Sequence, residues 1–144
     1  MSSQELQIAE AMLAVFKDRD LDAVLTDEEM SPYLDPAFEV HEEPDLPGGR
    51  VWSGYDGARG WRAEMADRWQ TVELEDERWI ERPGLIVLLA TMRSTGRGAG
   101  VTVDSPIGQV IEFREGRVRR VRYFRSHDEA LELAQSLDPE FANA

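Results

Sequence analysis

Four consecutive strand-like segments in the second half of the chain constrain its fold most. They read TVELEDERWIE, LIVLLATM, VTVDSPIGQVIEF and RVRRVRYF, and they are rich in β-branched and aromatic residues. Gly84, the run from Gly96 to Gly100, and Glu115 with Gly116 separate them. Glycine between such segments is typical of hairpin turns. The pattern therefore predicts an antiparallel meander from Thr71 to Phe124.

The first half of the chain shows helical periodicity instead. Apolar residues recur at steps of three and four near the start and predict a helix with one buried stripe: Leu6, Ala9, Met12, Leu13 and Phe16. Asp20 is expected to cap a second, short helix that carries Leu21, Val24 and Leu25. A third helix is predicted over SGYDGARGWRAEMADRW, where Ser53 and Asp56 have capping-box spacing.

A strand and a terminal helix complete the order of elements. Alternation places Phe38, Val40 and Glu42 on one side of the strand, with Glu39, His41 and Glu43 on the other. At the end of the chain, Ser126 and Glu129 have capping-box spacing before EALELAQSL, a helix that is expected to stop near Pro139. This order predicts an α+β fold in which helices pack against a curved sheet and enclose a pocket.

Composition limits the number of domains and the kinds of partner. The 144 residues, 42% of them hydrophobic, are sufficient for a single domain over 1–144. A formal charge of −13 disfavours nucleic acid and membrane surfaces as partners. The absence of cysteine excludes thiolate nucleophiles and sulfur-based zinc sites. The opening MSSQELQIAEAMLAVF lacks the features of a signal peptide, so a cytoplasmic location is expected.

Three groups of motifs resemble the SnoaL-like branch of the nuclear transport factor 2-like superfamily. They are RDLDAVL before FEVHEEPDLP, the pair WSGYDGARGW and VDSPIGQVIEFREGRVRRVRYF, and SHDEALELA. The resemblance implies a cone-shaped α+β fold in which a curved antiparallel or mixed sheet is covered on one face by the N-terminal helices. The connection TDEEMSPYLDP, residues 26–36, is longer than in many relatives, and its role stays open.

The resemblance also implies a range of activities. The superfamily includes ketosteroid isomerases, polyketide cyclases, epoxide hydrolases and dehydratases, as well as members that only bind, transport or assemble. Fold alone does not choose among these functions.

Glu42 is the leading candidate for chemistry. It continues the inward side of its strand, and VHEE before Pro44 is similar to VED before proline in the steroid isomerase relatives, where a carboxylate acts as the base. A carboxylate at an apolar pocket mouth is desolvated, which raises its pKa toward values useful for proton abstraction. The alternative is a frayed strand end with Glu42 in solvent.

Aromatic and polar residues supply candidates for ligand binding. Trp61, Met65 and Trp69 are spaced four apart on one helical face, which suits either core packing or an apolar ligand. Tyr55, Tyr123 and Gln109 are candidate hydrogen-bond donors to a ligand carbonyl or a developing oxyanion. For Tyr123 and Gln109, the alternative is a satisfied hydrogen bond in the core.

Arg93 and Asp104 are predicted to face one another. Counting outward from a turn at Arg97 to Gly100 places them opposite each other on adjacent strands, where an ion pair forms. A structural salt bridge is favoured over a ligand-orienting pair. The epoxide hydrolase relatives use an arginine flanked by two acidic residues. Arg93 is followed by Ser94 and Thr95, so Asp104 would have to supply an acid for this arrangement.

Two charged stretches have simpler interpretations. His41 with Glu42, Glu43 and Asp45 resembles a metal cluster in composition, but adjacent strand residues diverge, so no metal site is predicted and His41 is kept only as a ligand-binding candidate. The arginines of RVRRVRYFR are expected to pair with acids on the sheet surface, at a dimer interface.

The sequence therefore predicts a small-molecule pocket protein, either a cofactor-independent enzyme that moves protons or a non-catalytic binding or assembly domain. The expected partners are an apolar or ring-containing molecule and a second copy bound through the sheet. Expected catalytic residues are Glu42, Tyr55, Tyr123 and Asp104, and expected ligand-binding residues are Trp61, Met65, Trp69, Gln109, Arg93 and His41.

Overall fold

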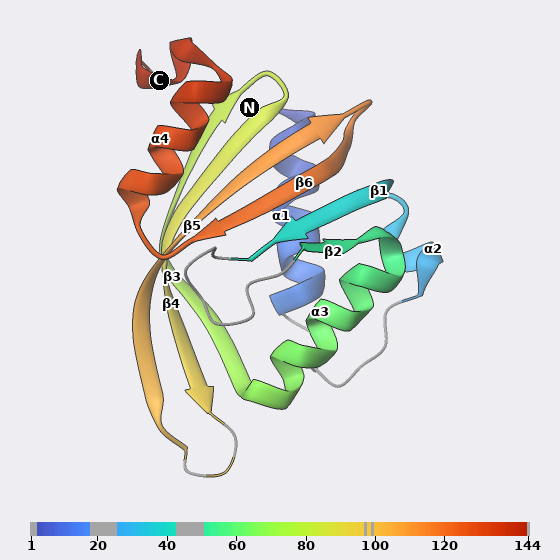
Figure 1. Ribbon diagram of the computed structural model, residues 1–144, viewed down its shortest axis with the longest axis vertical. Coiled ribbons are helices and arrows are strands. Elements are labelled where there is room, and N and C mark those ends of the chain that lie inside the picture. Colours follow the sequence, from blue (N-terminus) through green and yellow to red (C-terminus); the bar gives the residue numbers. More distant parts are fainter. Residues whose placement is uncertain (1–2, 18–25, 43–50, 97, 99, 144) are drawn as a thin grey trace.

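The computed structural model describes residues 3–17, 26–42, 51–96, 98 and 100–143, and it contains a six-stranded mixed sheet with helices packed against it (Figure 1). The predicted α+β class is confirmed. The elements in chain order are α1 (Gln4–Lys17), α2 (Asp27–Met30), β1 (Leu34–His41), β2 (Val51–Ser53), α3 (Gly54–Arg68), β3 (Trp69–Arg82), β4 (Leu85–Gly96), β5 (Thr102–Arg114), β6 (Arg117–Phe124), α4 (His127–Leu137) and the short 3-10 helix η1 (Pro139–Asn143).

The strand order is β2-β1-β6-β5-β4-β3. Strands β3 to β6 form the predicted antiparallel meander, and β1 joins it by pairing parallel with β6. The short edge strand β2, which was not predicted, pairs antiparallel with β1. Because β1 comes first in sequence but lies beside β6, the end of β1 is brought next to the end of the meander.

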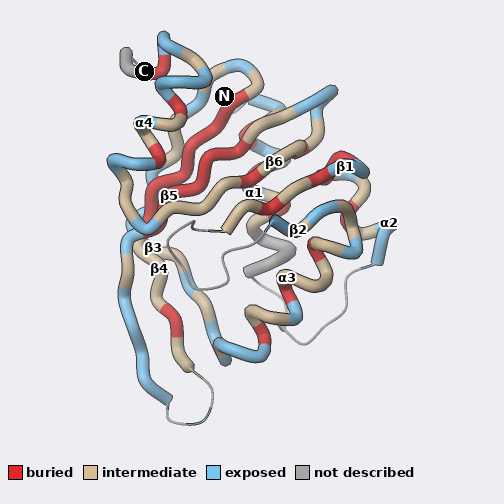
Figure 2. The backbone as a smooth tube through the Cα atoms, viewed as in Figure 1, coloured by how far each residue is buried: buried red, intermediate tan, exposed pale blue. Residues whose placement is uncertain are grey.

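The apolar run at the start of β4 is buried on both faces, which explains why it does not alternate. Leu85, Val87 and Leu89 pack with Ala130 and Ala134 of α4. The intervening side chains face the opposite side of the sheet, where Ile86 belongs to the core cluster that contains α1. Strands covered on both faces are continuously hydrophobic. Figure 2 shows the buried segments gathered in the part of β4 and β5 nearest α4.

Helix α1 forms as predicted and packs on the same face as α3. Leu6, Ala9 and Met12 are buried in one cluster with Phe38 and Val40 of β1, and Ala58 of α3 belongs to the same cluster. The apolar stripe at steps of three therefore becomes the inner face of α1. Both helices lie on the same side of the curved sheet (Figure 1).

Among the described residues, the helix starts differ from prediction in two places, at α2 and at Ser53. The short helix expected after Asp20 lies outside the described residues. Within 26–36 the chain forms α2, which begins with a full capping box between Thr26 and Glu29. Ser53 precedes α3 but makes no capping hydrogen bond from its side chain, whereas Ser126 accepts one from the Glu129 N–H at 3.3 Å.

The turn between β5 and β6 follows the prediction from Glu115 and Gly116. Both residues have positive φ, 52° and 80°, and the pair Arg114 and Arg117 closes the ladder beside them. Positive φ at both central residues defines the hairpin turn that matches strand twist, and glycine adopts it without a Cβ penalty. Within the described residues, no helix is both long and apolar enough to cross a membrane.

Candidate functional site

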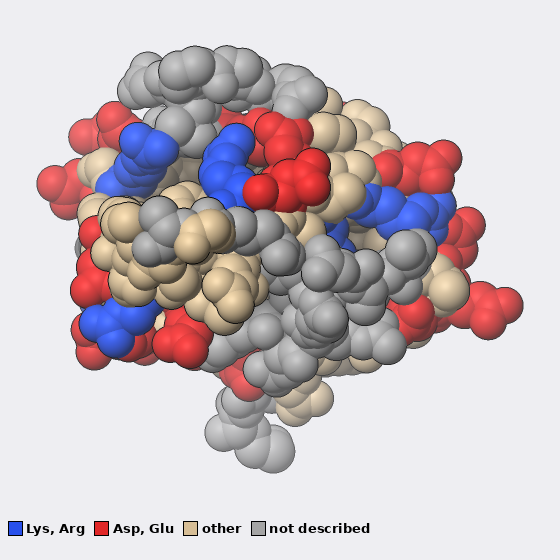
Figure 3. Space-filling view, turned by 90° about the horizontal axis from the view of Figure 1, so that it is seen from below, with Lys and Arg blue, Asp and Glu red and all other residues tan. Residues whose placement is uncertain are grey.

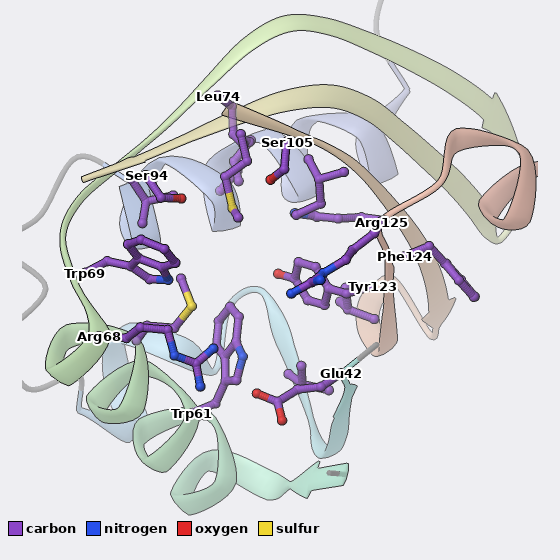
Figure 4. Close-up of a pocket in the computed structure, with 18 of the residues that line it drawn as sticks. Glu42, Trp61, Arg68, Trp69, Leu74, Ser94, Ser105, Tyr123, Phe124 and Arg125 are labelled. Atoms are coloured by element: carbon purple, nitrogen blue, oxygen red, sulfur yellow. The ribbon is translucent and has the colours of Figure 1, made fainter. Parts of the chain in front are cut away.

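A cavity of about 400 Å³ lies between the curved sheet and helices α1 and α3 (Figure 4). Most of its wall is apolar and comes from α1, β1, α3 and strands β3 to β6. Trp61, Met65 and Trp69, predicted as ligand-binding residues, all contribute to it. The polar side chains among the described lining residues are those of Glu42, Arg68, Ser94, Ser105, Gln109, Tyr123 and Arg125.

The alternation of side chains along β1 places Glu42 at the cavity. Phe38 and Val40 are each 2% exposed and also line it, and Glu42 is the next residue of the same parity, directly after the strand ends. Figure 4 shows the Glu42 carboxylate reaching inward on the side of the cavity where Tyr123 and Arg125 lie. A half-buried carboxylate thus borders an apolar space, as the strand pattern indicated.

His41 points to the other face of β1 and is not among the described lining residues. Its Nε2 lies 2.8 Å from Oε1 of Glu39, and Arg120 donates to the same oxygen at 3.1 Å. These hydrogen bonds, first that of His41 and then that of Arg120, lower the pKa of Glu39. Strand geometry therefore assigns His41 to a surface charge network rather than to the ligand site expected from sequence. No group of three His, Cys, Asp or Glu among the described residues is arranged to hold a metal.

The outer face of β1, β5 and β6 carries the expected pairing of arginines with acids. Arg120 also reaches Glu112 at 3.5 Å, and Arg122 lies 3.9 Å from the same carboxylate. On the face shown in Figure 3, acidic and basic side chains are likewise interspersed rather than separated. Charge pairing accounts for the basic stretch that looks in isolation like a nucleic-acid patch.

Tyr123 and Gln109 lie on neighbouring strands inside the cavity. They form a register pair between β5 and β6, and Gln109 is only 3% exposed. The ring of Tyr123 packs 5.5 Å from the ring of Trp61, centroid to centroid, at a tilt of 37°. Burial raises the pKa of Tyr123, so its phenol stays protonated and able to donate a hydrogen bond.

Tyr55 has a structural partner instead of a place in the cavity. Its hydroxyl donates to the carbonyl oxygen of Leu34 at 3.0 Å, and its ring packs against the core cluster that contains Leu34. This bond ties the first turn of α3 to the start of β1. The catalytic hypothesis for Tyr55 is therefore corrected, because its hydroxyl is committed to the backbone and lies outside the described lining.

Arg93 and Asp104 face one another as predicted, and both lie outside the cavity lining. Arg93 Nε donates to Asp104 Oδ1 at 2.9 Å, and a second hydrogen bond of 3.2 Å joins the same two side chains. Glu75 also pairs with Arg93 at 3.0 Å. The arginine thus has two acids, but the group sits on the outer side of β3 to β5. Neither the ligand-binding role of Arg93 nor the catalytic role of Asp104 fits this position.

Sequence reasoning missed Arg68, Arg125 and the two serines. Arg68 follows Met65 by three residues and therefore shares its helical face, a signal that was available from spacing. Ser94 follows Arg93, so the outward pairing of Arg93 already implied that Ser94 points inward. Ser105 stands in the same relation to Asp104. The alternation of side chains next to the Arg93–Asp104 pair therefore predicts that both serines point inward.

Comparison with known proteins identifies the family. A model of the SnoaL-like domain matches residues 9–121, and the chain belongs to that family. No curated protein matches the chain.

Solved structures confirm the fold. An NTF2-like protein of unknown function from Burkholderia pseudomallei is 20% identical, with a TM-score of 0.74 over 92% of this chain and 98% of that one. TerC, crystallised with polyporic acid, is 19% identical, with a TM-score of 0.73 over 92% and 99%. A SnoaL-like polyketide cyclase described from Jannaschia is 19% identical, with a TM-score of 0.65 over 86% and 88%.

Proposed function

We propose that the cavity binds a small, apolar, ring-containing molecule and that Glu42 moves a proton on it, without a cofactor. One observation carries the proposal: Glu42 and Tyr123 line the same largely apolar cavity. A base together with an oxygen-directed donor is the minimum needed for proton abstraction next to a carbonyl. Isomerisation, cyclisation and dehydration can each begin with this abstraction, whereas hydrolysis would require Glu42 to take its proton from an attacking water molecule.

The proposed step is a proton transfer that needs no oxidant or reductant. The Glu42 carboxylate takes a proton from the carbon next to a carbonyl, and the C–H electron pair moves to give an enolate with its charge on oxygen. Tyr123 donates a hydrogen bond to that oxygen, and its raised pKa keeps the phenol from ionising first. The protonated Glu42 then returns the proton to carbon. Hydrogen bonds and charges act more strongly in an apolar cavity than in water.

The aromatic wall supports a ring-containing ligand. Trp61 and Trp69 line the cavity from the middle of α3 and the start of β3, and Met65 lies between them along the chain. Aromatic and thioether side chains bind flat apolar molecules through large contact areas. TerC, a solved protein of the same fold, was co-crystallised with a small molecule, polyporic acid.

We also propose that two copies associate through the outer face of the sheet. Paired charges there, Glu39 with Arg120 and Glu112 with Arg122, provide the mixed surface that a symmetric interface uses. Sedimentation of the protein with and without Arg122→Glu tests this: a wild-type dimer that the reversal weakens supports it, and a wild-type monomer contradicts it.

Exchange of hydrogen for deuterium on 2-tetralone tests the proton transfer directly. This ketone has acidic hydrogens beside its carbonyl, so NMR in D₂O follows abstraction without knowledge of the natural product. We expect the protein to accelerate exchange, Glu42→Gln to abolish the acceleration, and Tyr123→Phe to reduce it. Asp104→Asn is the matched control, because it removes a carboxylate outside the cavity lining.

Binding of 2-tetralone, followed by tryptophan fluorescence, separates the two classes of function. A wild-type protein that binds the ketone and leaves its exchange rate unchanged would favour the alternative, a domain that holds ligands without catalysis. Retained acceleration in Glu42→Gln would remove Glu42 from the mechanism.

A further inference from the structure

Ser94 on β4 has a buried hydroxyl that lacks a hydrogen-bond partner among the described residues. The residue is 2% exposed, and it belongs to the cavity lining. Most buried hydroxyls in native proteins are hydrogen-bonded, because leaving water without a replacement bond costs free energy. An apolar alanine would fill this position without that cost. The unpaired hydroxyl at the wall of a ligand cavity therefore calls for a functional explanation.

The sheet register places Ser94 away from Glu42 and Tyr123. Tyr123 pairs with Gln109, and Gln109 pairs with Leu88 of β4. Ser94 lies six residues beyond Leu88 on the same strand and the same face. Figure 4 shows Ser94 beside Trp69, on the side of the cavity opposite Tyr123 and Glu42.

The residues opposite Ser94 on the two adjacent strands have no polar side-chain group that could bond to its hydroxyl. Val103 is opposite Ser94 on β5, and Val72 is opposite it on β3. Among the described residues that line the cavity, the hydroxyl nearest to Ser94 in register is that of Ser105, which pairs with Met92 rather than with Ser94. Because both adjacent strands present apolar side chains here, a partner for the Ser94 hydroxyl has to come from inside the cavity, as water in the free protein or as an atom of a bound ligand.

We propose that Ser94 binds an oxygen substituent of the ligand, a hydroxyl or a carbonyl, at the end remote from Glu42. This inference rests on the proposed function in taking the cavity as the ligand site. It narrows the ligand to elongated ring compounds that carry oxygen at both ends, one for Tyr123 and one for Ser94. A serine hydroxyl donates and accepts, and it turns about a single bond, so it can meet either kind of oxygen.

A purely structural role for Ser94 predicts something different. If serine is present only because it is small, its hydroxyl contributes nothing to binding, and alanine serves equally well for every ligand. If it is a binding group, alanine removes an unpaired buried hydroxyl and leaves the free protein as stable as before or more so, while affinity for one class of ligand falls. A loss of affinity without a loss of stability is therefore expected only under the proposal.

Two naphthols provide the matched probes. They are 2-naphthol and 2,6-dihydroxynaphthalene, which differ by one hydroxyl at the far end of the ring system, and tryptophan fluorescence reports their binding. We expect the wild-type protein to prefer the diol by about twofold to twelvefold, the factor that one net hydrogen bond of about 0.5 to 1.5 kcal/mol provides. Ser94→Ala should lose that preference, with an unchanged or higher midpoint in urea, and Ser94→Thr should retain it.

The outcomes separate this inference from the proposed function. If both naphthols bind equally to the wild-type protein, or if Ser94→Ala keeps the preference for the diol, Ser94 is not the binding group, while the cavity stands as a ligand site. If neither naphthol binds, the proposed function falls and this inference falls with it.

Discussion

Gly108 of β5 and Ala130 of α4 lie so close that a Cβ atom at position 108 would stand 2.6 Å from the Cβ of Ala130. Carbon atoms in favourable contact are about 3.5 to 4.0 Å apart. The backbone oxygen of Ser126 would also lie within 3.5 Å of the added atom. Glycine at 108 and alanine at 130 therefore set how closely α4 approaches the sheet.

Gly108→Ala should destabilise the protein by about 1 to 3 kcal/mol, the usual cost of forcing extra volume into a packed interface. Urea unfolding measures the change. The double variant with Ala130→Gly provides the control, because it removes the clashing methyl group. Although glycine inside a helix itself costs about 1 kcal/mol, the double variant should be less destabilised than the sum of the two single changes. Simple additivity would show that the contact does not limit the packing.

Ser126→Ala should cost about 1 kcal/mol, because the Ser126 side chain accepts the N–H of Glu129 at the start of α4. Ser53→Ala is the matched comparison: Ser53 also precedes a helix but makes no such bond from its side chain. Its effect on the free energy of unfolding should stay within about 0.5 kcal/mol. Equal losses from the two substitutions would contradict the difference between these caps.

Asp35 should make the protein sensitive to acid. The residue is 4% exposed, and its carboxylate accepts two hydrogen bonds from Arg114, at 2.9 and 3.1 Å. The hydrogen bond to Arg114, aided by the Ala37 N–H, lowers the pKa of Asp35 below its ordinary value of 3.8. A lowered pKa in the folded state means that the carboxylate contributes stability above about pH 4 and loses it as the pH falls through the folded pKa.

Urea unfolding at a series of pH values measures this contribution. Asp35→Asn should be less stable than the wild-type protein at pH 7, and the gap should shrink as the pH falls below about 4. A gap of constant size from pH 7 to pH 2 would mean that the Asp35 charge adds nothing to stability.

Tyr123 should affect stability at the opposite end of the pH scale. Burial raises its pKa above the ordinary value of 10.0, so the unfolded chain loses this phenol proton before the folded protein does. Its contribution to stability is therefore complete below about pH 10 and is lost as the pH rises toward the folded pKa. Stability should fall less steeply above pH 10 in Tyr123→Phe than in the wild-type protein. Parallel curves for the two proteins would exclude a shifted Tyr123.

Local pattern was sufficient for most of the secondary structure. The stripe through Leu6, Ala9 and Met12, the hairpin at Glu115 and Gly116, and the alternation from Phe38 to Glu42 each depend on residues close in sequence. The register of Arg93 with Asp104 followed from counting back from one turn. These features could be predicted because the helical and strand periods act over a few residues.

Contacts between distant elements decided the rest. Ser53 and Ser126 precede helices with the same spacing, yet only one caps, because the conformation around each start depends on its surroundings. Edge strand β2 forms by pairing with β1, which precedes it in the chain. Tyr55 does not line the cavity, because its hydroxyl donates to the carbonyl oxygen of Leu34.

The sequence by itself determined the α+β class, the family resemblance and the inward direction of Glu42. Only the tertiary structure decided which polar side chains share one cavity, because the curvature of the sheet and the parallel pairing of β1 with β6 bring Glu42, Tyr123 and Ser94 around the same space. Glu42, Ser94 and Tyr123 lie far apart along the chain, and the helical and strand periods, which act over a few residues, do not specify which distant elements come together.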